Sequence, residues 1–114
     1  MQPNITIQYQ SVPRFDIDAS DAAEYLEEFG FVVYANALAE TEATHALALL
    51  WDYLEELGTG IDRNDISTWD DDRWPTSVHG AILPSYGIGH TAAQWYIRDI
   101  PKVKQSFANV WDTD

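Results

Sequence analysis

The apolar residues in the first half of the chain change their spacing twice, which predicts a helix, a short strand and a second helix. The first helix is predicted to run to about Phe29, because Gly30 suits a left-handed C-terminal cap. Its start has three candidate capping residues: Asp18, Ser20 and Asp21. Its apolar face has spacings of three and four residues: Ala22, Tyr25, Leu26 and Phe29.

The run from Phe31 to Ala35 is short and rich in β-branched and aromatic residues. It is apolar on both faces, as expected of a strand that is covered on both sides. Helical spacing returns from about Glu40 to Leu57, and Gly58 is expected to end this second helix. Its apolar set is Ala43, Ala46, Leu47, Leu50, Leu54 and Leu57.

The second half of the chain is predicted to be a loop followed by helices. Residues 58–78 are rich in turn formers and hold at most a short helical turn near Ile66 to Asp71. We expect Trp69 and Trp74 to fasten this loop to the body of the protein. Two later residues favour helix starts, with Thr91 as an N-cap and Pro101 in a first turn.

The length of 114 residues predicts one domain. Its expected class is α+β, mostly helical with one or two short strands, the second being the alternating segment at residues 4–9. The predicted organisation is an extended lead-in at 1–17, helix-strand-helix at 18–57, a Trp- and Gly-rich loop at 58–90 and helices at 91–114.

Nineteen acidic residues against six basic ones give a net charge of -13, which disfavours nucleic acid and anionic membranes as partners. The chain has no cysteine, and its start has neither a basic region nor an apolar core of signal length. We therefore expect a soluble, cytoplasmic protein. The glycosylation sequon at Asn4 to Thr6 is interpreted as a chance match.

The chain has three histidines that could suggest a metal site: His45, His79 and His90. None of them lies in a His-X-Asp or His-X-X-X-His motif. The acidic run Asp70 to Asp72 lacks the spacing of a calcium loop and favours a solvated turn. We therefore predict no metal ligand within the chain.

Other patterns that could carry chemistry are equally incomplete. Gly87-X-Gly89 is too short for a phosphate-binding loop and is interpreted as a turn that enters a helix. No nucleophile elbow accompanies the hydroxyl residues near the histidines, so neither a catalytic nor a cofactor-binding residue is predicted. Those hydroxyl residues are Ser77, Ser85 and Thr91.

Trp95 and Arg98 lie three residues apart on a predicted helix. The guanidinium group can pack over the indole, or it can reach the carboxylate or phosphate of a substrate. Packing is the more common outcome, and the sequence leaves both roles open.

Two stretches together resemble phytanoyl-CoA dioxygenase-like oxygenases. Residues 28–38, EFGFVVYANAL, followed by a long helix, are similar to the opening of such enzymes. The second stretch is similar to the corresponding part of one branch of the group: Gly87 to His90, Trp95 to Arg98, Pro101 to Val103 and Phe107 to Trp111.

The resemblance covers about residues 18–114 and implies the N-terminal part of a double-stranded β-helix (jelly-roll) oxygenase, with the barrel incomplete. Such enzymes hold Fe(II) with a His-X-Asp/Glu motif and a distant His, and they bind 2-oxoglutarate beside it. This chain contains no His-X-Asp or His-X-Glu, so no catalytic residue is carried over. We expect an inactive N-terminal fragment whose parent hydroxylates a small organic substrate.

A hypothesis of a different class is a complete small acidic α+β interaction module. Such a module would bind a basic or apolar protein partner through exposed aromatic residues of its loop. The candidate residues are Trp69, Trp74 and Tyr86.

Overall fold

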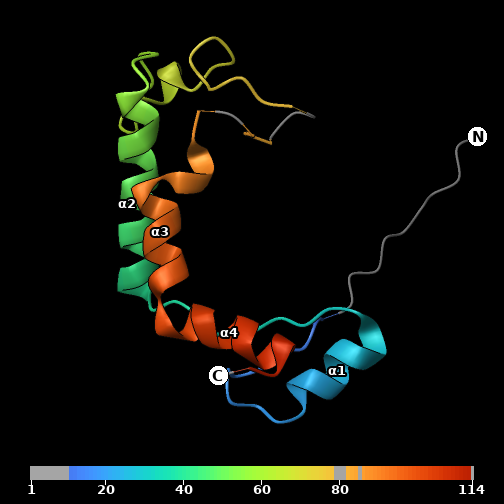
Figure 1. The fold of residues 1–114 in the computed structure, drawn as a ribbon. Coiled ribbons are helices and arrows are strands. Elements are labelled where there is room, and N and C mark those ends of the chain that lie inside the picture. The colour runs from blue at the N-terminus through green and yellow to red at the C-terminus, as the bar shows by residue number, and fades with distance from the viewer. Residues whose placement is uncertain (1–10, 79–81, 85, 114) are drawn as a thin grey trace, which may run out of the picture.

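The structure is a computed structural model that describes residues 11–78, 82–84 and 86–113. These residues form four α-helices and two short 3-10 helices, joined by turns and extended segments (Figure 1). In chain order they are α1 (Ala22–Phe29), α2 (Glu40–Glu56), η1 (Ile66–Thr68), η2 (Ile88–His90), α3 (Ala92–Asp99) and α4 (Pro101–Trp111).

Helices α2 and α3 lie side by side and form one arm of the molecule (Figure 1). Leu54 on α2 is 3% exposed and Ala93 on α3 is 4% exposed. The small side chains at Ala46 and Ala93 are typical of positions that allow two helices to approach closely. The edge of the His45 ring meets the Tyr96 ring, with 4.7 Å between the ring centroids.

The second arm consists of α4 and α1 (Figure 1). The chain turns at Ile100, which has extended backbone angles, and Pro101 begins α4 at the position where proline is best tolerated. The side-chain amide of Asn109 donates to the carbonyl of Ile17 over 2.8 Å. This contact, between residues far apart in sequence, attaches α4 to the segment that precedes α1.

The arrangement is open, and its interior is small. The Cα radius of gyration is 18.5 Å, whereas a compact domain of about 100 residues has about 13 Å. The buried apolar residues of the core are few, and half of them are alanine: Ala22, Ala46, Leu54, Ile61, Ala93 and Ile100. Much apolar surface therefore faces outward, for example at Phe107 and Trp111, which are 64% and 73% exposed.

The prediction of an α+β fold that begins a jelly-roll is wrong, because the described residues are helical and contain no strand, sheet or barrel. Residues 31–35 make only one isolated parallel bridge, between Phe15 and Tyr34. Its hydrogen bonds are Phe15 N–H to Val33 O at 2.9 Å and Ala35 N–H to Phe15 O at 2.7 Å. The second predicted strand, at residues 4–9, lies outside the described residues.

The physical reason is that a strand needs partners, and its propensity mostly reports packing against neighbours. Phe15 supplies one pair of hydrogen bonds, and Asn36 then turns the chain with a positive φ of 57°. Phe31 contributes to a cluster of rings instead, with its ring edge-on to Tyr25 at 5.6 Å.

Several local predictions are confirmed. Gly30 caps α1 with φ 78°, Thr91 is the N-cap of α3, and α4 begins at Pro101. The short helical turn predicted in the loop is η1. The α1 N-cap is Asp21, although its side chain makes no capping hydrogen bond.

Candidate functional site

The two histidines that the structure describes do not meet in a metal site. His45 lies exposed on α2 against Tyr96, and His90 lies at the end of η2 with its ring 6.0 Å from that of Trp95. His79 lies outside the described residues. Within residues 11–78, 82–84 and 86–113 no three His, Asp or Glu side chains group closely enough to hold a metal ion. These residues do not fit an iron centre of two histidines and a carboxylate.

In the acidic run Asp70 to Asp72, the first residue pairs with a nearby arginine of the same loop. Asp70 accepts a hydrogen bond of 2.9 Å from the backbone N–H of Arg73 and pairs with the guanidinium group of that residue. Asp71 and Asp72 are exposed, as expected of a solvated turn. Nothing in this geometry gathers the three carboxylates around one point.

Thr91 has a structural role. Its hydroxyl donates to the carbonyl of Ile88 over 3.0 Å and accepts from the N–H of Gln94 at 3.4 Å, which caps α3. Gly87 has φ 69° and precedes η2, consistent with a turn that enters a helix. Of the other hydroxyl residues considered, Ser77 is half-buried, and Ser85 lies outside the described residues.

The aromatic loop is fastened to α2, as predicted for Trp69. The indole N–H of Trp69 donates to the carbonyl of Asp62 over 2.8 Å, and its ring lies 5.0 Å from that of Trp51. The hydroxyl of Tyr53 donates to the carbonyl of Tyr86 over 2.8 Å. Trp69 and Tyr86 therefore hold the loop in place, although each remains about half exposed.

Arg98 and Trp95 pack together. The central carbon of the guanidinium group lies 5.3 Å from the centre of the Trp95 ring, and one terminal nitrogen donates to Gly89 O over 2.8 Å. Both side chains remain exposed. Within the described part of the chain no carboxylate pairs with Arg98, so the remaining guanidinium donors can serve a ligand or partner.

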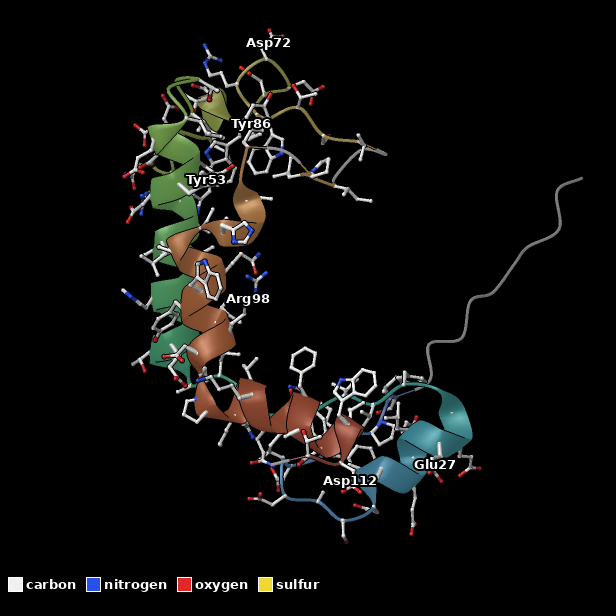
Figure 2. All side chains as sticks on the ribbon, viewed as in Figure 1. Glu27, Tyr53, Asp72, Tyr86, Arg98 and Asp112 are labelled. Atoms are coloured by element: carbon white, nitrogen blue, oxygen red, sulfur yellow. The ribbon has the colours of Figure 1, made fainter. Side chains whose placement is uncertain are left out.

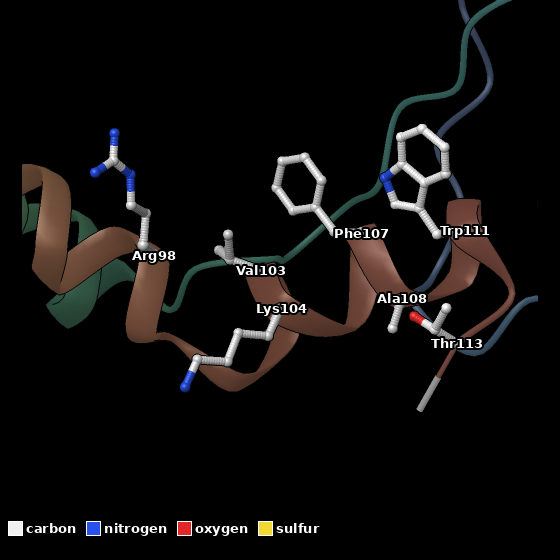
Figure 3. A pocket seen from close by; sticks show the side chains of 7 residues that line it. All are labelled: Arg98, Val103, Lys104, Phe107, Ala108, Trp111 and Thr113. Carbon is white, nitrogen blue, oxygen red and sulfur yellow. The ribbon is translucent and has the colours of Figure 1, made fainter. Parts of the chain in front are cut away.

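Arg98 also borders a shallow groove of about 400 Å³ on α4, called here the α4 groove (Figure 3). In Figure 3 the side chains of Arg98, Val103, Phe107 and Trp111 project in a row from the same side of the ribbon. The full lining is Arg98, Val103, Lys104, Phe107, Ala108, Trp111 and Thr113. The groove brings a cation to the end of an exposed apolar stripe.

Sequence reasoning missed the groove and a second polar cluster. At the end of α2, Arg63 donates to Glu55 from its backbone N–H over 2.9 Å and from two guanidinium nitrogens over 2.9 and 2.8 Å. It also pairs with Asp52. These bonds lower the pKa of Glu55 to about 2, chiefly through the side-chain hydrogen bond. The cluster has partners for its charges and is structural.

Comparisons with known proteins give two partial relatives. A protein of Aspergillus versicolor named Ava biosynthesis cluster protein O is 30% identical over 94 residues, 80% of this chain. A Dictyostelium discoideum protein provisionally named a phytanoyl-CoA dioxygenase is 34% identical over 64 residues, 56% of this chain. The chain spans 30% of the first relative and 18% of the second.

No family model and no solved structure matches the chain. The similarity to the Dictyostelium protein agrees with the family that residues 28–38 and 87–111 resemble, and it gives that resemblance weak support. Among the described helices, none is long and apolar enough to cross a membrane.

Proposed function

We propose that these residues are the helical N-terminal portion of an Fe(II)- and 2-oxoglutarate-dependent oxygenase related to phytanoyl-CoA dioxygenase. The observation that carries the proposal is the 34% identity over 64 residues to the Dictyostelium protein with that provisional name. The longer protein would hydroxylate a small organic substrate, coupled to oxidative decarboxylation of 2-oxoglutarate.

In this proposal the helices support the catalytic domain and take no part in the chemistry. The described histidines are separated on α2 and η2, and the sequence has no His-X-Asp or His-X-Glu. The iron ligands therefore belong to residues outside these 114. Taken alone, the chain is expected to turn over no substrate.

The open shape supports a role within a larger protein. The radius of gyration is 18.5 Å, and few side chains are buried between the two arms. The described residues bury six apolar side chains in all, of which three are alanine. Exposed rings such as Phe107 and Trp111 are costly in water at about 25 cal/mol per Å² of apolar surface, so contact with further protein would stabilise this arrangement.

The test begins with the transcript beyond the codon for Asp114. A reading frame that continues into a His-X-Asp or His-X-Glu motif and a distal His supports the proposal. The longer protein should then bind Fe(II) and 2-oxoglutarate without oxygen, seen as a visible charge-transfer band, and lose the band when the motif His is changed to Ala. A genuine stop codon directly after Asp114 in an abundant transcript contradicts the proposal.

The alternative is a small acidic interaction module that uses Trp69, Trp74 and Tyr86. These three side chains are 45%, 38% and 54% exposed, which favours a contact surface. A complete module should be monodisperse and should unfold in one cooperative transition, whereas a part of a larger protein should aggregate through its exposed apolar residues. Sedimentation velocity and urea unfolding of the 114-residue chain distinguish the two.

A further inference from the structure

Residues 98–111 carry more basic than acidic side chains, unlike the protein as a whole. Three of the six basic residues lie within seven positions, at Arg98, Lys102 and Lys104, and residues 100–111 contain no acidic residue. The nearest acids flank the helix, and Asp99 is already paired with Lys104 at 2.6 Å. Lys102 shares a pocket with Asp16 and Asp18, whereas Arg98 has no ion pair among the described residues.

The apolar stripe of α4 follows helical spacing. Val103, Phe107, Val110 and Trp111 stand at positions i, i+4, i+7 and i+8, the pattern by which an amphipathic helix meets a partner. Phe107, Val110 and Trp111 are 64%, 47% and 73% exposed. Rings that project this far can enter pockets of a partner and act as anchors.

The other face of α4 is already occupied. Asn109 donates to Ile17 O over 2.8 Å, and the Lys102 ammonium group donates to Asn36 O over 3.4 Å. These contacts fix the rotation of the helix about its axis, so the stripe faces away from the segment that holds α4. Figure 3 shows the rings of Phe107 and Trp111 projecting from the same side of α4 as Val103.

The guanidinium group of Arg98 is positioned by two contacts and has donors left for an anionic group. The Trp95 ring lies beneath its guanidinium group, and Gly89 O accepts from one terminal nitrogen. The other donors are left for a carboxylate, the partner that a planar guanidinium group binds best. Arg98, which is labelled on α3 in Figure 2, lies at the end of the stripe (Figure 3).

We propose that the α4 groove docks an apolar polypeptide helix that carries a carboxylate side chain at its Arg98 end. Charge complementarity selects this occupant, because the groove pairs an apolar stripe with a cation while the rest of the chain is acidic. An anionic membrane is disfavoured by the net charge of -13. This inference rests on the proposed function in one respect, because Phe107 and Trp111 are rings that further protein of the longer chain would cover.

The probe is a fluorescein-labelled, helix-forming peptide of Leu, Ala and Gln, with Leu at i, i+3, i+4 and i+7 and one Glu near an end. Its anisotropy is measured while the 114-residue chain is titrated in. Replacing the peptide Glu by Gln should weaken binding of the peptide to the wild-type chain about fivefold. The same replacement should weaken binding to the Arg98→Gln variant by less than about twofold. Arg14→Gln removes the same charge from a site off the groove and should retain the fivefold effect.

The apolar contribution is tested on the same peptide. Phe107→Ala should weaken binding about tenfold or more, as expected of an anchor residue. Ile66→Ala, which removes an apolar side chain from η1 that is even more exposed than Phe107, should leave binding unchanged. Circular dichroism confirms that both variants keep the helical content of wild type.

Four results would overturn the inference. The first is that the peptide does not bind. The second is that replacing the peptide Glu by Gln weakens binding equally for wild type and for Arg98→Gln. The third is that wild type co-sediments with phosphatidylserine vesicles and Phe107→Ala does not. The fourth is a concentration-dependent dimer that Phe107→Ala dissociates, because the occupant would then be a second copy of the chain.

Discussion

Arg63 donates to the Glu55 carboxylate from its guanidinium group and from its own backbone N–H, with three bonds of 2.8 to 2.9 Å. The loop that leaves α2 is thereby folded back onto the last turn of the helix. Asp52 pairs with the same guanidinium group one turn earlier. The cluster therefore determines the direction in which residues 58–69 leave α2.

The Glu55 pair predicts a pH dependence of stability. Arg63 lowers the pKa of Glu55 from 4.5 to about 2, first through the side-chain hydrogen bond. A lowered pKa in the folded state contributes stability that is present above pH 4.5 and lost as the pH falls toward 2. Glu55→Gln should therefore melt below wild type at pH 6, with the difference shrinking as the pH falls from 4.5.

Glu56→Gln is the control for this experiment, because Glu56 is its exposed neighbour on the same helix. Its melting temperature should stay close to that of wild type across the range. A Glu55→Gln difference that is constant from pH 6 to pH 2.5 would contradict the pairing with Arg63. Melting is followed by circular dichroism of the full chain.

The contact between α2 and α3 predicts a contrast between two leucines of the same helix. Leu54 is 3% exposed and Leu47 is 56% exposed. Leu54→Ala should lower the free energy of unfolding by about 2 to 5 kcal/mol, because it leaves a cavity in a small core. Leu47→Ala should change it by less than about 0.5 kcal/mol. Equal effects in urea unfolding would show that these helices pack differently.

Replacing Gly30 is predicted to lower stability through backbone strain alone. Its φ is 78°, and a Cβ added there would meet nothing within 4 Å. Gly30→Ala should therefore destabilise the protein by about 1 kcal/mol through left-handed strain. Gly89→Ala is the matched control, since its site is equally open and has no left-handed φ. Chemical unfolding of both variants provides the measurement, and a neutral Gly30→Ala would argue against the cap.

Tyr53 predicts a measurable hydrogen bond between α2 and the segment before η2. Its hydroxyl donates to Tyr86 O over 2.8 Å, and burial raises its pKa. Tyr53→Phe should lower the free energy of unfolding by about 1 kcal/mol. Tyr96→Phe, at a half-buried ring on α3, should have a smaller effect, and the reverse order in urea unfolding would contradict this assignment.

The sequence by itself determined the helices and most of their ends. The apolar spacing of α2, the glycine after Phe29, the threonine before α3 and the proline that begins α4 all act within about one helical turn. Interactions of that range can be read directly from neighbouring residues.

Tertiary structure alone decided how residues 31–35 are used and which apolar faces are covered. Those residues have a strand pattern, but a strand requires a ladder, and Phe15 provides one bridge only. The position of Arg98 over Trp95 and at the edge of the α4 groove depends on the turn at Ile100 between two helices. Helical spacing predicts an apolar face, but only packing between distant segments determines whether that face is buried or left open to a partner.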